Sequence, residues 1–210
     1  MSIKKYSFLT ILLYIAAFFA PIFATTSQAS TTTTTVSYLL GAVLMIFLYY
    51  NQSAKLTFEK GHSSLISILF WGIGGIFLAI FLQTLVMQVE QFFGIPIESQ
   101  NTQNILQLVL RQPLFALAAM VGGPIMEEFV FRRALIGIFD SFSLTWLGIV
   151  ISSLIFAFIH QDGHLLLYFS LGFFFSLLYK KTGKIWTSMI SHVGMNSLVV
   201  IVNFIVINGN

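Results

Sequence analysis

Long apolar stretches separated by short polar connectors make up most of the chain. Helices that cross a membrane need about 20 apolar residues, and seven stretches approach or exceed that length: 7–24, 37–50, 64–89, 105–131, 144–163, 164–179 and 185–207. Of these, 37–50 and 164–179 are short, so we expect them to be tilted, extended or partly re-entrant. The pattern predicts an all-α fold, a polytopic transmembrane helix bundle of about seven spans.

Polar segments mark the connectors between these predicted helices. They are a threonine-rich linker (25–35), a charged segment (51–63), a polar and acidic segment (90–104) and a basic turn (180–184). Lysine and arginine concentrate in the cytoplasmic loops of membrane proteins. With a cytoplasmic N-terminus, every Lys and Arg except Arg111 falls in or beside a cytoplasmic connector, so we predict an N-in, C-out topology.

The first apolar stretch has a second interpretation. Lys4 and Lys5 before an apolar run, with small residues around 24–29, are also typical of a cleaved secretory signal peptide. The run is long for such a signal and Pro21 lies late in it, which favours a span. Cleavage would leave six spans and would not affect the C-terminal candidate site.

Composition supports a membrane protein and narrows its chemistry. Hydrophobic residues make up 57% of the 210 residues and charged residues only 8%, whereas soluble domains carry about 25% charged residues. The chain has no cysteine, which excludes disulfides, thiolate metal sites and a cysteine nucleophile. The net charge of +3 forms no basic face. We therefore expect membrane lipid as a partner and no nucleic acid.

Several polar residues fall within the apolar stretches. An ionisable group at the bilayer centre costs from about 2.5 kcal/mol upward, so each such group is a functional candidate. The candidates are Glu127, Glu128, His160, His192 and Asn196. Four other ionisable residues lie near the ends of predicted spans, where we expect interfacial or packing roles without chemistry: His62, His164, Asp140 and Arg111.

The two adjacent glutamates differ in their helical neighbours. Glu128 and Arg132 are four residues apart on one helix face, so the spacing predicts an ion pair. Glu127 points about 100° away and lacks that partner, which suits a general base. Gly122 and Gly123, about one turn earlier, predict close helix approach and a local kink.

Two further pairs have the same spacing of four residues. Phe156 can brace His160, and His192 shares a face with Asn196. Two imidazoles, a carboxylate and an amide are compatible with a divalent metal site or with an activated water beside an oxyanion pocket. A single membrane histidine is commonly a packing residue, and a Glu–Arg pair a topology anchor. Three such groups on three predicted C-terminal spans favour function.

The motifs occur in a familiar order. "EEFVFRR" (127–133), "FAFIH" (156–160) and "HVGMN" (192–196) match Glu-Glu-x-x-x-Arg, Phe-x-x-x-His and His-x-x-x-Asn. Together they resemble the CPBP family of intramembrane proteases, also called Abi, which comprises CAAX prenyl endopeptidases and bacteriocin-processing enzymes. We divide the chain accordingly into a protease core (106–207), its catalytic core in the C-terminal four helices, and an N-terminal transmembrane region (1–105) of no recognised family.

The resemblance implies roles for the matched residues. Glu127 would activate the attacking water with help from His160, while His192 and Asn196 would bind a metal or the tetrahedral oxyanion. Glu128, Arg132 and Phe156 would support the site. A zinc ion held by Glu127, His160 and His192 and a metal-free, glutamate-dependent mechanism both remain open.

The candidate residues must also meet at one depth. At about 1.5 Å per residue, a helix beginning at Leu144 would carry His160 deeper than Glu127 and His192. We therefore expect 134–147 to lie at the cytoplasmic interface, the following helix to start nearer Gly148, and a polar cavity to open towards the cytoplasm.

These observations favour an intramembrane endopeptidase in a bacterial plasma membrane. Its substrate would be a prenylated C-terminal tail, a bacteriocin or pheromone leader, or a membrane protein's tail. The alternatives are a non-catalytic immunity or regulatory partner protein and, least favoured, a small transporter. Gly72, Gly74 and Gly75 indicate close packing, either within the fold or with a second chain, so the oligomeric state is open.

Overall fold

The computed structural model describes residues 1–61 and 63–208, and the elements in that part of the chain are all helical, which confirms the predicted all-α fold. His62, one of the predicted packing residues, lies outside the described residues. The elements are α1 (Ile3–Phe19), η1 (Ala20–Phe23), α2 (Ser27–Tyr50), η2 (Thr57–Lys60), α3 (Leu65–Phe92), α4 (Gln100–Arg111), α5 (Phe115–Leu117), η3 (Ala118–Gly122), α6 (Gly123–Glu127), η4 (Glu128–Leu135), α7 (Ile136–Asp140), α8 (Thr145–His160), α9 (Leu165–Thr182) and α10 (Ile185–Asn208).

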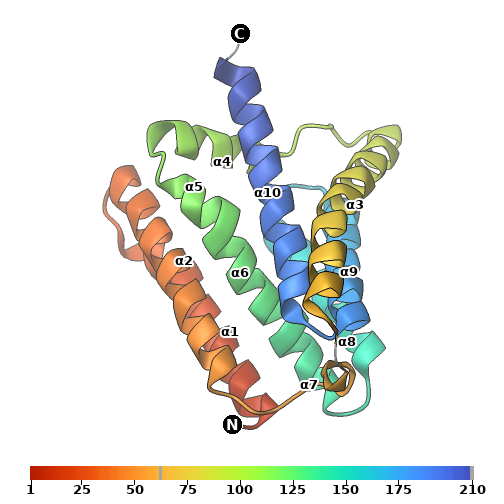
Figure 1. Ribbon diagram of the computed structural model, residues 1–210. Helices are drawn as coiled ribbons and strands as arrows, with labels where there is room; N and C mark the ends of the chain where they lie inside the picture. The colour runs from red at the N-terminus through yellow and green to blue at the C-terminus, as the bar shows by residue number, and fades with distance from the viewer. Residues whose placement is uncertain (62, 209–210) are drawn as a thin grey trace.

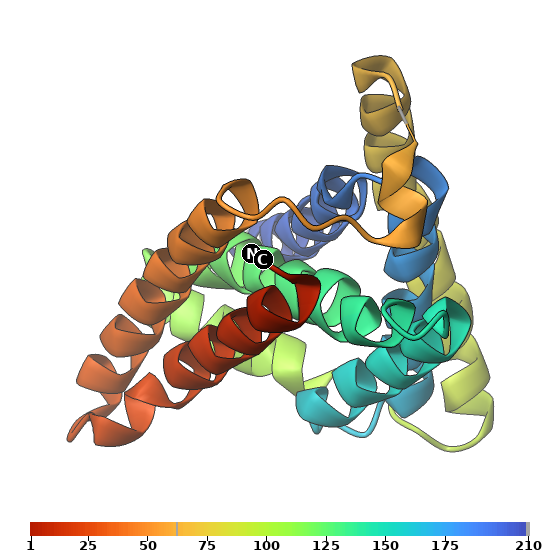
Figure 2. The ribbon, with the colours of Figure 1, turned by 90° about the horizontal axis from the view of Figure 1, so that it is seen from below.

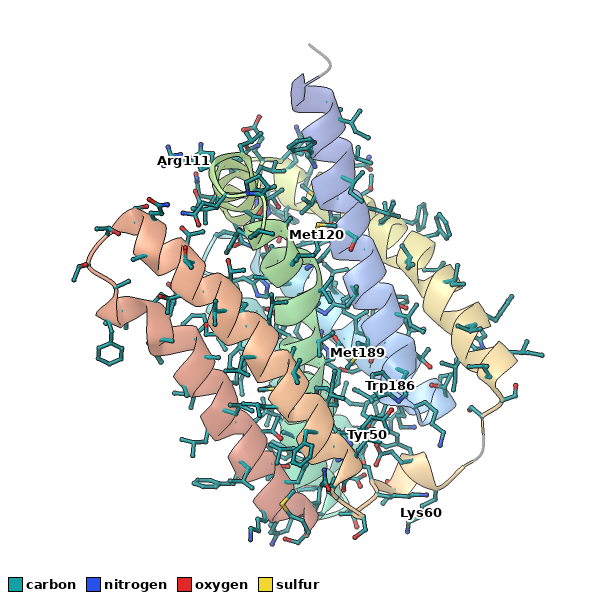
Figure 3. All side chains as sticks on the ribbon, turned by 60° about the vertical axis from the view of Figure 1, so that its left-hand side comes forward. Tyr50, Lys60, Arg111, Met120, Trp186 and Met189 are labelled. Carbon is teal, nitrogen blue, oxygen red and sulfur yellow. The ribbon has the colours of Figure 1, made fainter. Side chains whose placement is uncertain are left out.

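The long helices run alternately between two ends of a bundle (Figure 1). The N-terminus and the α2–α3, α7–α8 and α9–α10 connections lie at one end, while α4 lies across the other. We call them the basic end and the α4 end. Lys60 and Arg111 mark them in Figure 3. The lysines belong to elements at the basic end: Lys4, Lys5, Lys55, Lys60, Lys180, Lys181 and Lys184.

Four helical segments among the described residues are long and apolar enough to cross a membrane. They are Ile3–Phe23, Ser27–Tyr50, Leu65–Phe92 and Ile185–Val206. The other predicted spans fall on shorter helices, such as α8, or on the run α5–α7, which is divided by π-helical turns. The chain thus has several helices that are long and apolar enough to cross a membrane. The total of about seven crossings stays a prediction.

The predicted threonine-rich linker is wrong, because this segment is helical. The hydroxyl of Thr26 caps α2 by accepting from the Ala29 amide at 3.1 Å. Within the helix, threonine hydroxyls donate to carbonyls four residues earlier at 2.8–3.0 Å; these donors are Thr31, Thr32, Thr34 and Thr35. The polar side chains are therefore satisfied inside the helix, which makes the predicted short span 37–50 the second half of a 24-residue helix.

The predicted span 105–131 is also interrupted. Helix α4 ends at Arg111, and α5 begins at Phe115. Pro113 explains the break, since the residue before a proline is disfavoured in helical conformation. Beyond it, a continuous helical run from Phe115 to Asp140 includes π-helical turns η3 and η4.

This central run lies between two groups of helices. Seen from the basic end, α1 and α2 lie on one side of it, with α3 and α9 on the other (Figure 2). Gly122 permits the contact with α2, because a Cβ there would lie 3.1 Å from the Tyr38 carbonyl carbon. The close approach predicted at Gly122 and Gly123 is confirmed.

Glycines in α3 bring α10 close. A Cβ at Gly72 would lie 3.0 Å from the Ile190 side chain, and one at Gly75 would overlap the Ser191 hydroxyl. That hydroxyl donates to the Gly72 carbonyl at 2.8 Å. At Gly74, by contrast, a Cβ would meet no atom within 4 Å. The packing of Gly72 and Gly75 is therefore internal, and it fixes α10 next to His192.

Helix α1 is an integral part of the bundle. Its Ser7 hydroxyl donates to the Ala134 carbonyl at 2.9 Å, and the fully buried Tyr6 ring lies 4.7 Å from the Arg133 guanidinium. This packing against the central run favours the span over the signal-peptide interpretation.

Candidate active site

Glu128 and Arg132 form the predicted ion pair. The Arg132 Nε lies 3.3 Å from Glu128 Oε1, and both side chains are buried. Three aromatic rings surround the guanidinium, with its carbon 4.3 Å from the Phe156 ring centroid and farther from Phe131 and Phe175. The arginine charge is therefore balanced by one carboxylate and by ring faces, and the pair forms the buried base of the candidate site.

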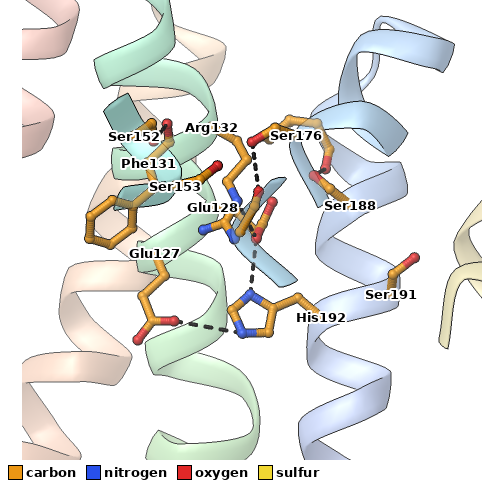
Figure 4. Close-up of polar contacts among 12 residues, drawn as sticks. Glu127, Glu128, Phe131, Arg132, Ser152, Ser153, Ser176, Ser188, Ser191 and His192 are labelled. Atoms are coloured by element: carbon orange, nitrogen blue, oxygen red, sulfur yellow. Dashed lines mark hydrogen bonds and ion pairs between the residues drawn. The ribbon is translucent and has the colours of Figure 1, made fainter. Parts of the chain in front are cut away.

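His192 lies between the two adjacent glutamates (Figure 4). Its Nδ1 is 2.9 Å from Glu128 Oε1, and its Nε2 is 3.6 Å from Glu127 Oε2. A carboxylate only accepts, so Nδ1 carries the proton in the bond to Glu128. Phe175 stacks on the imidazole at 4.7 Å. The two glutamates thus differ as predicted: Glu128 is buried in the ion pair, while the Glu127 side chain is 19% exposed.

His160 is held through one ring nitrogen. Its Nδ1 lies 2.7 Å from the Phe156 carbonyl oxygen, which can only accept. Nδ1 therefore donates, leaving the lone pair of the neutral ring on Nε2. The Phe156 ring packs edge-on at 4.5 Å, so the predicted brace is confirmed.

Two cavities bring the candidate residues to a shared space. The larger, about 450 Å³, is lined by Glu127, His160 and Asn196. The smaller, about 90 Å³, is lined by His160, His192 and Asn196. His160 and Asn196 line both, so residues from three separate motifs face one composite site. Helices α1 and α2 also contribute to the wall of the larger cavity, through Tyr14, Phe18, Thr34 and Tyr38.

Glu127 lies deeper in the bundle than the sequence suggested, because the helical run that contains it continues to Asp140. Arg132 and Arg133 do not mark a helix end, because both are buried and paired. Glu127 lies thirteen residues before Asp140, where α7 ends, and His160 lies fifteen residues after Thr145, where α8 begins. The two residues reach similar depth without the predicted interfacial segment 134–147, most of which is helical.

The predicted opening of the cavity towards the cytoplasm does not fit the predicted N-in topology, which makes the basic end cytoplasmic. The cavities are lined by Ser99 and Asn101 before and in α4, by Thr34 in the first half of α2 and by Gln161 after α8. These positions belong to the α4 end (Figure 1). The mismatch follows from taking the arginines as the edge of the apolar layer.

Comparison with known proteins gives a family match over the C-terminal part of the chain. Residues 109–198 match the model for type II CAAX prenyl endopeptidases of the Rce1-like kind. YdiL of Bacillus subtilis strain 168, provisionally named a membrane peptidase, is 36% identical over 77% of this chain and 68% of its own length. The chain belongs to the Rce1-like CAAX endopeptidase family. It is therefore a multi-pass membrane protease by family and by its apolar helices.

A second relative of this Rce1-like chain is known from another bacterium. The membrane-embedded CAAX protease MroQ of Staphylococcus aureus strain USA300 is 28% identical, and the match covers 93% of this chain and 87% of the relative. No solved structure matches the chain.

The Rce1-like site does not present a ready metal centre. Among residues 1–61 and 63–208, no group of three or more His, Asp or Glu side chains is arranged to hold a metal ion. In the predicted set Glu127, His160 and His192, the Nδ1 of each histidine is bonded to the Phe156 carbonyl or to Glu128, while the Nε2 atoms take no part in these bonds. Because these side chains do not form such a group, we derive no step through a metal.

Asp140, expected at the interface, is instead buried, and His164 has the packing role predicted for it. Asp140 accepts from the Thr57 amide at 2.7 Å, the Thr57 hydroxyl at 2.6 Å and the Thr145 hydroxyl at 2.5 Å. His164 Nδ1 lies 2.7 Å from Glu90 Oε2. Their polar groups are used in holding connections between helices, because a buried polar group must find partners.

The sequence did not predict that Tyr168 and Asp162 lie next to His160. Tyr168 stacks on His160 at 3.8 Å, and its hydroxyl donates to Asp162 at 2.9 Å. Helical spacing could not link them, because α8 and α9 are separate helices. The one available signal was the closeness of Asp162 and Tyr168 in sequence to the candidate histidine.

Proposed function

We propose that the protein is an intramembrane endopeptidase in which Glu127 activates the attacking water. Glu127 takes a proton from the water while the water oxygen bonds to the peptide carbonyl carbon. The same proton then passes from Glu127 to the departing amine nitrogen as the C–N bond breaks. His160 supports the water through its Nε2 lone pair. Water is the only co-reactant.

Asn196 and His192 serve the oxyanion in this proposal. Both line the smaller cavity, where the Asn196 amide is a donor and His192 is fixed by Glu128 and Phe175. Preorganised donors facing the developing oxyanion are commonly the largest single contribution to acyl-transfer catalysis. Glu128 and Arg132 are positioning residues, since they act through His192.

The observation that carries the proposal is the shared cavity of about 450 Å³ lined by Glu127, His160 and Asn196. A partly exposed carboxylate with a histidine 3.6 Å away, in a cavity large enough for a peptide segment, suits water activation. Such a carboxylate in an apolar bundle has no structural partner comparable to the one that Glu128 has in Arg132.

The test compares Glu127→Gln with Glu98→Gln in purified protein. The first change removes the general base while keeping side-chain shape, and the second alters an exposed glutamate in the segment before α4. Cleavage of quenched peptides should fall at least about 100-fold in Glu127→Gln, the lower range for removing an acid–base group. Equal activity of the two variants would refute the assignment.

The substrate class is tested in the same assay. We propose a membrane-associated peptide tail, and the panel includes a farnesylated peptide ending in Cys-aliphatic-aliphatic-X, its unprenylated counterpart and an apolar leader peptide. Cleavage of the farnesylated peptide alone supports prenyl-protein processing. Cleavage of the leader peptide supports a bacteriocin or pheromone role in a bacterial plasma membrane, which fits the organisms of the two relatives.

Treatment with a chelator tests whether cleavage requires a metal ion. Because the site offers no ready ligand set, we expect cleavage to persist after EDTA treatment with metal content measured on the same sample. Loss of activity that returns on adding zinc would replace the metal-free mechanism.

The alternative is a non-catalytic immunity or regulatory partner. Complementation in cells separates it from the protease. If Glu127→Gln and His192→Ala, expressed at normal levels, fully restore the phenotype of a deletion strain, the function does not require peptide cleavage.

A further inference from the structure

We propose that Tyr168 is a positioning residue for His160, fixing the plane of the imidazole within the cavity; this rests on the proposed function. The two rings stack with centroids 3.8 Å apart and planes inclined by 20°. Both residues line the smaller cavity. Tyr168 belongs to α9, so the contact joins the site to a second helix.

The position of His160 in its helix creates the need for such a contact. His160 is the last residue of α8, and Gln161 turns into the left-handed region with φ of 50°. No further turn of α8 follows to pack beside the imidazole. Its orientation depends on Phe156, one turn earlier, and on residues from other elements.

Tyr168 is itself firmly held. Its hydroxyl donates to Asp162 Oδ2 at 2.9 Å, and the amide of Asn101 lies 3.4 Å from the tyrosine oxygen. The Ser99 hydroxyl donates to the same Asp162 oxygen at 2.7 Å. The N-terminal end of α4 and the α8–α9 connection therefore anchor the ring from its polar edge, and the buried ring transmits that anchoring to His160.

The stack restricts the motion that the other contacts leave free. The bond from Nδ1 to the Phe156 carbonyl fixes one ring nitrogen but allows the ring to tilt about it, which displaces Nε2. A flat ring at 3.8 Å blocks that tilt. Misplacing a reacting group by about 1 Å can cost about 100-fold in rate, so the effect should fall on kcat.

The experiment measures kcat and KM for Tyr168→Leu, Tyr168→Phe and Phe169→Leu. Phe169→Leu is the matched control, since it makes the same kind of change at the next position of α9, where the ring packs on Phe173 instead. The probe is the farnesylated peptide or its unprenylated counterpart, whichever the wild type cleaves. Glu127→Gln is assayed in parallel, with apparent melting temperature in detergent for every variant.

We expect kcat to fall about 10- to 100-fold in Tyr168→Leu with KM changed by less than about threefold. Tyr168→Phe keeps the stacked ring and should lose less than about fivefold. Phe169→Leu should retain the wild-type kcat. A purely structural role would lower the melting temperature and the active fraction in both leucine variants and would leave kcat per folded molecule unchanged.

Several results would overturn the proposal. One is a folded Tyr168→Leu variant with kcat within twofold of wild type; another is a Tyr168→Phe variant as impaired as Tyr168→Leu. If Tyr168→Leu does not fold, Asp162→Ala takes its place, because it keeps the ring but removes its anchor, and an unchanged kcat there also contradicts the proposal. Full activity of Glu127→Gln would instead reject the proposed function itself.

Discussion

Arg132 and Arg133 are adjacent in the sequence, and each forms a buried ion pair with a glutamate, but the two pairs have different surroundings. Arg132 pairs with Glu128 at 3.3 Å, and Arg133 pairs with Glu59 at 3.1 Å. Both guanidiniums are enclosed by aromatic rings, those of Phe156 for Arg132 and of Tyr6 and Tyr49 for Arg133. By burial and pairing alone, the two are hardly distinguishable.

They differ in what else the carboxylate holds. Glu128 accepts from His192, whose other nitrogen faces Glu127 in the candidate site. Glu59 accepts from the Tyr179 hydroxyl at 2.5 Å and from the Leu56 amide at 2.8 Å. The first pair lies against the candidate site beside a cavity, while the second ties the α2–α3 connection to α9. In our proposal, the two pairs are therefore told apart by the third residue that each glutamate holds, His192 for Glu128 and Tyr179 for Glu59.

The largest expected effect comes from Glu128→Gln. It removes the charge that balances Arg132 and holds His192, so we expect cleavage to fall by about 1,000-fold, the upper range for losing an oxyanion donor. Breaking a buried pair also costs about 3–5 kcal/mol of stability. Glu59→Gln should show a similar loss of stability but keep kcat within about threefold, measured per folded molecule. If both variants lose kcat equally, the comparison fails.

Removing both charges of a pair separates its effect on stability from its effect on cleavage. Replacing a buried ion pair by apolar residues is often neutral or stabilising by about 1–4 kcal/mol. The Glu128→Met/Arg132→Met protein should thus fold yet lose cleavage by more than about 100-fold, because His192 loses its acceptor. The Glu59→Met/Arg133→Met protein should fold and cleave. Melting temperature and kcat on the same samples decide, and an active Glu128→Met/Arg132→Met protein would contradict the role of Glu128.

A smaller effect is expected at the α3–α10 contact behind His192. The Cβ that Gly75→Val adds would overlap the Ser191 hydroxyl and Leu178, whereas a Cβ at Gly74 would meet no atom within 4 Å, so Gly74→Val is the control. Overpacking typically costs about 1–3 kcal/mol. Because Ser191 adjoins His192, we also expect kcat to fall about tenfold in Gly75→Val. Equal behaviour of the two valine variants would mean that this packing does not position the site.

The sequence predicted the parts of the site that obey helical spacing. The Glu128–Arg132 pair and the Phe156–His160 brace each lie four residues apart on one helix, and the structure confirms them. Contacts across helices, such as His192 with Glu128, have no such rule and came only from the structure.

The errors had physical causes of the same kind. Arg132 and Arg133 suggested a membrane edge because charge is normally solvated there, yet Glu128 and Glu59 neutralise them inside the bundle. The threonine-rich segment suggested a linker because its hydroxyls are polar, yet they bond within α2. In both places the polar groups had partners that composition does not show.

The smallest predicted effect tests the structural pair alone. Tyr179→Phe removes the hydroxyl that donates to Glu59, and a hydrogen bond to a charged group contributes about 1.5–3 kcal/mol. We expect a lower melting temperature with unchanged kcat and KM. Tyr50→Phe, at an exposed tyrosine at the end of α2, is the control and should change neither. A fall in kcat for Tyr179→Phe would show that the Glu59 network reaches the candidate site, and the separation between the two arginine pairs would then be lost.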